Sequence, residues 1–236
     1  MDLEFIPVLY TPGHFGTWIC WLINQHLRFP KYGQGPKNRD SRDIIIAADI
    51  GSLPSNFYYY NLSDWDTYYA DIISPISTID KNVNKFSFKF HPNHNFTNDD
   101  ASLDVDGINK IFSYIGVKKT VITFVDTALV SEIKKRWEYL EDYDHGAADA
   151  EMFYRWQLAN IPNYDKINAD YLLLDVGKML LGSIDEYKKL TDFIDEPPLD
   201  NFKELCKSHH DFAFYFMNSI NKIAIELKNY NYKVGV

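Results

Sequence analysis

The sequence has few cysteines, no long apolar run and no excess of positive charge. Its two cysteines, Cys20 and Cys206, form no metal-ligand or redox spacing within the 236 residues, so both are expected to be reduced. No stretch approaches the roughly 18 apolar residues of a membrane span, and residues 1–9 lack the basic start of a signal peptide. We therefore expect a cytoplasmic protein without a membrane partner.

The charge balance disfavours another class of partner. A formal net charge of −9 opposes general affinity for nucleic acid, which is itself negative. Aromatic residues are abundant, with 17 Tyr and 16 Phe. The chain is 46% hydrophobic, so it has enough apolar side chains to fill a folded interior. A chain of this length fits one α/β domain better than two, so residues 1–236 are treated as a single domain.

Short apolar runs typical of buried strands alternate with segments of helical period along the chain. Such alternation predicts an α/β fold in which helices cover both faces of a mainly parallel sheet, as in a three-layer α/β/α architecture. The alternating Phe86, Phe88 and Phe90 predict a strand with one buried face. The predicted strands lie at about 4–9, 43–49, 85–92, 119–126 and 170–175, and the helices at about 16–27, 64–73, 104–115, 128–143, 147–160, 184–194 and 200–228.

Ligands of parallel α/β sheets bind beyond the carboxyl ends of the strands. Three segments of this chain follow such ends: the turn after Leu9, the loop that begins at His91, and the segment after Val125. We expect the functional site where these segments meet.

The turn after the first strand reads "PGHFGTW". It lacks the lysine and the hydroxyl of the G-x-x-x-x-G-K-[ST] loop, which disfavours an ATPase or a kinase. It resembles instead the 5′-phosphosulfate loop of sulfotransferases, commonly P-K-S-G-T-T-W. Pro12, Thr17 and Trp18 match, while Gly13 stands at the lysine position.

The resemblance implies a fold like that of the P-loop nucleoside triphosphate hydrolases and 3′-phosphoadenosine 5′-phosphosulfate as co-substrate. Backbone amides at the start of a helix suit the 5′-phosphosulfate anion, because they are unpaired donors at the positive end of the helix dipole. The residues implied in this binding are Pro12, Gly13, His14, Phe15, Gly16, Thr17 and Trp18.

The segment "FKFHPNH" resembles the K-x-H-x-P segment that many sulfotransferases carry after a strand. Lys89 and His91 match its spacing, and Pro92 comes one position early. The resemblance implies that His91 is the general base, since an imidazole titrates near the working pH, and that Lys89 offsets charge on the leaving oxygen. The alternative is that both residues only line the solvent face of a strand.

The junction after Val125 resembles the R-x-P-x-D-x-x-x-S segment that binds the 3′-phosphate of the nucleotide in this family. Ser131 falls on the serine position, which implies contact with the 3′-phosphate, and the arginine position falls on Thr123.

Two functions follow from these patterns. The first is sulfuryl transfer to a hydroxyl of a small molecule or a glycan, without a metal ion. The second is a binding module of the same fold that has lost its catalytic cations and contacts a glycan, a nucleotide or a protein partner; it is favoured by Gly13 and Thr123, which stand at positions that are usually cationic. The acceptor and the oligomeric state stay open.

Overall fold

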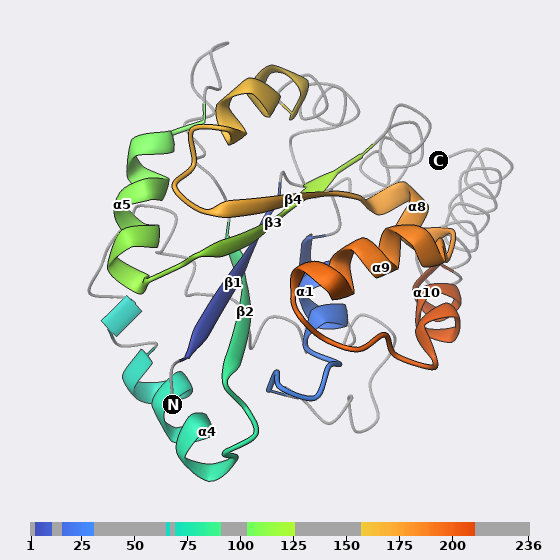
Figure 1. The fold of residues 1–236 in the computed structure, drawn as a ribbon, viewed down its shortest axis with the longest axis horizontal. Coiled ribbons are helices and arrows are strands. Elements are labelled where there is room, and N and C mark those ends of the chain that lie inside the picture. The colour runs from blue at the N-terminus through green and yellow to red at the C-terminus, as the bar shows by residue number, and fades with distance from the viewer. Residues whose placement is uncertain are drawn as a thin grey trace, which may run out of the picture.

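The computed structural model describes residues 3–10, 16–30, 65–66, 69–90, 103–125 and 157–210. In this part of the chain, four strands form one parallel sheet in the order β2-β1-β3-β4, as Figure 1 shows. The strands are β1 (Glu4–Leu9), β2 (Lys85–Phe90), β3 (Lys119–Phe124) and β4 (Asp170–Asp175). The predicted α/β class with a parallel sheet is confirmed.

Helices separate the strands along the chain. Residues 157–164 are also helical. The helices with described bounds are α1 (Gly16–Ile23), the π-helical turn η3 (Tyr69–Ile73), α4 (Ser74–Ile79), α5 (Val105–Ile115), α8 (Val176–Leu180), α9 (Ile184–Phe193) and α10 (Phe202–His210).

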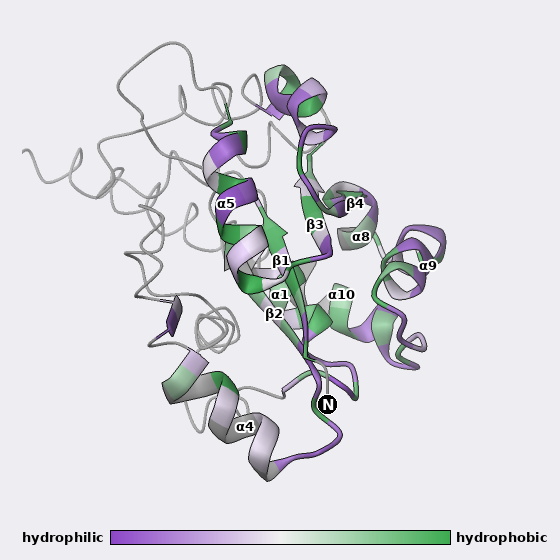
Figure 2. Cartoon of the chain, turned by 60° about the vertical axis from the view of Figure 1, so that its left-hand side comes forward, coloured by the Kyte–Doolittle hydropathy of each residue, from purple (hydrophilic) through white to green (hydrophobic). Residues whose placement is uncertain are grey.

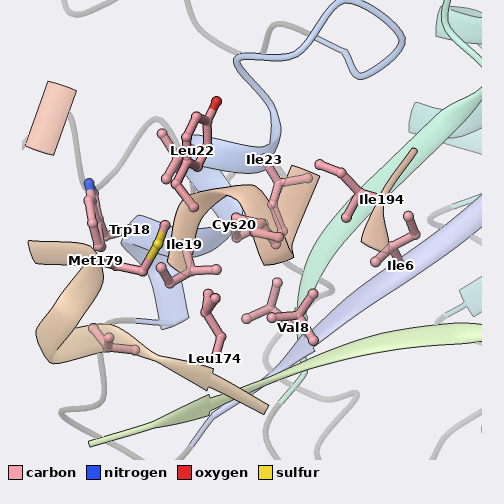
Figure 3. Packing of buried hydrophobic residues seen from close by; sticks show 14 of the residues in the cluster. Ile6, Val8, Trp18, Ile19, Cys20, Leu22, Ile23, Leu174, Met179 and Ile194 are labelled. Atoms are coloured by element: carbon pink, nitrogen blue, oxygen red, sulfur yellow. The ribbon is translucent and has the colours of Figure 1, made fainter. Parts of the chain in front are cut away.

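One face of the sheet packs against α1, α8, α9 and α10. Alternate residues of β1, Ile6 and Val8, point into this cluster because successive side chains of a strand face opposite ways. Figure 3 shows Trp18, Ile19 and Met179 together in this cluster.

The opposite face packs against α5 and the segment around η3. Phe5 and Leu9 supply the contribution of β1, and Phe86, Phe88 and Phe90 supply that of β2. Figure 2 shows α5 on one side of the strands and α8 and α9 on the other. Both faces of the sheet are thus covered by apolar contacts within the described residues.

Helix α5 follows its local sequence signals closely. The Asp104 carboxylate caps the first turn by accepting the Gly107 N–H at 2.9 Å. Gly116 ends the helix with φ = 81°, a left-handed conformation that glycine adopts without steric cost, and its N–H donates to the Phe112 carbonyl. The predicted helix and its stop at Gly116 are confirmed.

Helix α1 begins at the predicted residue but is shorter than predicted. It ends at Ile23 instead of Leu27. The Gln25 and His26 amides donate to carbonyls three residues earlier, as in a 3₁₀ turn, instead of four residues earlier as in an α-helix. The His26 ring is thereby brought beside Tyr187 of α9.

The predicted helix over 64–73 is also different. Residues 69–73 form a π-helical turn that leads directly into α4, which runs to Ile79. Pro75 is the second residue of α4 and lies two residues after the last residue of the π-helical turn.

The prediction that β2 buries only one face is wrong. Its phenylalanines are buried as expected, but Lys85 and Ser87 are buried as well, with 2% and 1% of their surfaces exposed. The Ser87 hydroxyl lies 3.7 Å from the Cys20 sulfur of α1, and the Lys85 ammonium is surrounded by carboxylate and carbonyl oxygens. A polar residue in a strand can be buried when its partners are supplied from another element.

Several predicted elements lie outside the described residues. They are the strand at 43–49, the helix at 128–143, the start of the helix at 147–160 and everything beyond residue 210.

Candidate functional site

The three predicted site segments begin at one edge of the sheet. In the parallel register, Leu9 of β1 lies opposite both Phe90 of β2 and Ile122 of β3. Phe90 directly precedes His91, and β3 ends two residues beyond Ile122. Strand β1 lies between β2 and β3. From β1 the chain crosses to β2 on one side of β1, and it then crosses back to β3 on the other side. This reversal of strand order is where ligands of open parallel sheets bind.

Most of the predicted site residues lie outside the described part of the chain, and their placement stays a prediction. They are Pro12, Gly13, His14, Phe15, His91 and Ser131. The backbone of Lys89 is described: it is the fifth residue of β2 and pairs with Val8.

Gly16 meets Tyr10 across the turn between β1 and α1. A Cβ atom placed on Gly16 would overlap the Tyr10 side chain, so only glycine fits this close approach. The residues on the two sides of segment 11–15, Tyr10 and Gly16, are therefore in close contact. Gly16, Thr17 and Trp18 form the first turn of α1, and amides of such a turn can donate to a bound anion.

The Trp18 indole belongs to the core. Its side chain is 2% exposed and packs in the cluster that includes Met179 and Leu174 (Figure 3). Any contact of Trp18 with an anion at the turn would therefore come from its backbone amide.

Thr123 occupies the position at which the resemblance places an arginine. Its side chain is 2% exposed, and its hydroxyl donates to the Leu9 carbonyl at 3.5 Å. Thr120, at the other end of β3, donates in the same way to the Pro7 carbonyl at 3.0 Å. These hydroxyls connect β3 to β1, and the Thr123 side chain is buried within the sheet.

Two polar side chains of the helical residues 157–164 contact this edge, and sequence reasoning missed both. Gln157 hydrogen-bonds both backbone groups of Val125, and Asn160 accepts the Leu103 N–H. Nothing in the sequence identifies their partners, which are 32 and 57 residues away. Their spacing of three, which places them on one face of a helix, is the only signal.

A cluster of charges lies at the opposite, amino edge of the sheet. Lys85 lies 3.2 Å from Glu4 and 3.8 Å from Glu196, and Arg28 pairs with Glu196 at 2.5 Å. Lys119 pairs with Asp195 at 2.5 Å, and this hydrogen bond lowers the pKa of the Asp195 carboxyl. The cations Arg28, Lys85 and Lys119 are therefore neutralised at the far end of the strands from the predicted anion site.

Comparison with protein-family models and with curated proteins finds no match for this chain. Among the helices that the structure describes, none combines the length and the apolar composition needed to cross a membrane.

Proposed function

We propose that this chain is a sulfotransferase-like protein with a three-layer α/β/α fold of the P-loop nucleoside triphosphate hydrolase type. Its substrates are 3′-phosphoadenosine 5′-phosphosulfate and a hydroxyl of a small molecule or a glycan. The observation that supports this proposal is the alignment of Leu9, Phe90 and Ile122, which brings the starts of the three motif segments to one edge of a parallel sheet. Helix α1 opens at the same edge.

The proposed chemistry is an in-line transfer. The imidazole of His91 accepts the proton of the acceptor hydroxyl as its oxygen forms a bond to sulfur. The bond between sulfur and the bridging oxygen breaks, and 3′-phosphoadenosine 5′-phosphate leaves with the electron pair. Lys89 offsets charge on that oxygen, amides of residues 13–18 hold the 5′-phosphate, and Ser131 contacts the 3′-phosphate.

The test separates turnover from nucleotide binding. In His91→Ala, turnover of 3′-phosphoadenosine 5′-phosphosulfate falls by about two orders of magnitude or more, whereas the Kd for 3′-phosphoadenosine 5′-phosphate changes little. Lys89→Ala, two residues earlier in the sequence, lowers turnover because the charge on the leaving oxygen is then less well offset. Equal loss of turnover and binding in His91→Ala, or no loss of either, would remove His91 from the role of base.

A binding module of the same fold is the second candidate. It is favoured by Thr123, whose buried hydroxyl contacts Leu9 where the family has an arginine. Calorimetric titration with 3′-phosphoadenosine 5′-phosphate discriminates between the two: tight binding supports the transferase, and no binding at millimolar ligand supports a module for another partner.

A further inference from the structure

Helix α9 ends in a hydrogen-bonding pattern that usually contains a glycine. The Glu196 N–H donates to the Thr191 carbonyl at 3.0 Å, and the Asp195 N–H donates to the Asp192 carbonyl at 3.4 Å. These two bonds define a Schellman motif, in which the residue after the cap has a left-handed conformation. Here that residue is Asp195, with φ = 53°, and no other non-glycine residue in the described ranges has a positive φ. An aspartate thus stands where glycine is the less strained residue.

Three cations from the amino edge of the sheet converge on the end of α9. They come from the segment after α1, from the start of β2 and from the start of β3. Each donates to one carbonyl: Arg28 to Asp195, Lys85 to Ile194, and Lys119 to Phe193. The last carbonyls of a helix lack helical partners and carry partial negative charge, so these cations stabilise the end of α9.

The two carboxylates that follow the helix bind the same three cations. Asp195 pairs with Lys119 at 2.5 Å. The Glu196 side chain is 1% exposed, and its carboxylate pairs with Arg28 at 2.5 Å and lies 3.8 Å from Lys85. Main-chain and side-chain groups of one short segment are therefore attached to three separate elements.

The other end of this segment is held by a neutral histidine. The Leu199 N–H donates to the Tyr187 phenol oxygen at 2.9 Å, and the same oxygen lies 3.2 Å from Nε2 of His26. The phenol proton has Nε2 as its acceptor, and an imidazole nitrogen accepts a hydrogen bond only when it carries no proton. Protonation of His26 therefore breaks this arrangement, and it also places a positive charge near that of Lys85.

The segment leads directly into α10, which packs on the same tyrosine. The Phe202 ring is stacked on the Tyr187 ring, with centroids 3.7 Å apart and an angle of 4° between the planes. Phe202 and Cys206 are 2% and 1% exposed and belong to the cluster that also contains Met179 of α8. Figure 1 shows that the chain turns back after α9, so that α9 and α10 lie side by side.

We propose that residues 194–199 are an acid-sensitive latch that opens together with α10, as one unit, while the sheet stays folded. The latch is attached mostly by polar contacts, and α10 has nine residues. The sheet is instead paired along its strands and covered by apolar clusters on both faces. Parts of a fold with fewer apolar contacts open locally at a lower free energy.

The titration of His26 sets the pH range in which the latch opens. Its side chain is 1% exposed, and opening the latch brings the ring into water. Burial lowers the pKa of His26 to about 4, the charge of Lys85 acts in the same direction, and the Pro197 carbonyl acts against them. An exposed imidazole titrates near pH 6.5, so the closed latch is fully favoured above that pH and loses stability as the pH falls toward 4.

The other titratable groups around this contact do not account for opening in that range. Burial raises the pKa of Tyr187 and of the Cys206 thiol to about 12, so both stay neutral. The hydrogen bond from Lys119 lowers the pKa of the Asp195 carboxyl, so Asp195 stays charged until the pH falls further. Glu196 is held between Arg28 and Lys85.

Hydrogen exchange of the whole wild-type chain, followed by mass spectrometry, tests the latch. Peptides that cover residues 194–210 are compared with peptides that cover β3, after correction for the intrinsic exchange rate at each pH. At about pH 7 the protection of 194–210 is lower than that of β3 by about tenfold or more. It falls by about twentyfold more between about pH 7 and about pH 5, as pKa values of about 4 and 6.5 require. Equal protection of the two regions at pH 7, or protection of 194–210 that does not change with pH, would overturn the proposal.

Two variants separate the latch from general stability. Thr120→Val removes the buried hydrogen bond to Pro7 within the sheet, so it lowers the protection of β3 and leaves that of 194–210 within about twofold. His26→Gln does not titrate, so its protection over 194–210 changes by less than about twofold between the two pH values. If Thr120→Val lowered the protection of both regions equally, α10 would open only when the whole chain unfolds, and the latch would be ruled out.

Discussion

His26 and Tyr187, 161 residues apart, share a buried hydrogen bond of 3.2 Å between the imidazole Nε2 and the phenol oxygen. The same phenol oxygen accepts the Leu199 N–H at 2.9 Å. The contact therefore connects the end of α1, helix α9 and the chain that follows the two prolines after Glu196. Burial lowers the pKa of His26 to about 4, and the positive charge of Lys85 acts in the same direction.

The first prediction concerns the pH dependence of stability. The unfolded chain protonates His26 near pH 6.5, whereas the folded chain resists protonation down to about pH 4. The free energy of unfolding that is due to this residue is thus constant above pH 6.5 and falls as the pH decreases toward 4. The total loss is about 3 kcal/mol, measured by urea unfolding across this range.

The matched control for this prediction is His26→Gln, which keeps a hydrogen-bonding side chain but cannot titrate. Its free energy of unfolding changes less with acid than that of the wild type. Parallel pH profiles for the two proteins would show that His26 is not responsible.

The second prediction compares a buried ion pair with an exposed one. Lys85 is 2% exposed and contacts Glu196, itself 1% exposed, whereas Lys178 is 60% exposed in its pair with Asp175 at 2.9 Å. Lys85→Met leaves buried carboxylate charge less compensated and lowers the free energy of unfolding by about 3 kcal/mol. Lys178→Met lowers it by less than about 1 kcal/mol. Equal effects in chemical denaturation would contradict the structural role of Lys85.

The third prediction concerns the close approach of Gly16 and Tyr10. Alanine is a better helix former than glycine by about 1 kcal/mol, but a methyl group on Gly16 overlaps the Tyr10 side chain. We expect overlap to dominate, so Gly16→Ala destabilises the protein by about 1–3 kcal/mol. A Tyr10→Ala background removes the overlaps with the ring atoms and keeps the one with the Cβ atom, so the same substitution costs less there but still has a cost, and a double-mutant cycle by thermal unfolding measures the difference. Additive effects would show that the two residues do not interact.

The fourth prediction concerns the two thiols. Cys20 and Cys206 are buried and form no disulfide with each other, and burial raises the pKa of the Cys206 thiol to about 12. The thiolate is the reactive form, so the Cys206 thiol is not expected to react with a disulfide reagent at mild alkaline pH until guanidinium unfolds the chain. Cys20 is not expected to react either, because its side chain is fully buried and the reagent cannot reach it. Rapid modification of either thiol in the folded protein would contradict this arrangement.

The sequence alone predicts which strand precedes each segment of the predicted site, but not where the side chains of those segments lie. The pattern predicted strands that end at Leu9, Pro92 and Asp126, and the structure ends them at Leu9, Phe90 and Phe124. The parallel register places these three ends at one edge of the sheet. The roles of His91, Lys89 and Ser131 stay predictions, because they depend on the resemblance of short segments to those of sulfotransferases.

Local signals in the sequence determined the fold class and several element boundaries. Strand β4 over Asp170–Asp175 and helix α5 with its stop at Gly116 follow from hydrophobic periodicity and from caps within a few residues of each end. These features need no distant partner, so the residues themselves specify them.

Only the tertiary structure decided which polar residues are buried and what each one contacts. Lys85, His26 and Gln157 find their partners 109, 161 and 32 residues away, on elements that come together only in the folded chain. Periodicity tells which residues share a face of a strand or helix, but it carries no information about what covers that face. For this reason the buried polar face of β2 and the contact between Gln157 and Val125 had to come from the folded structure.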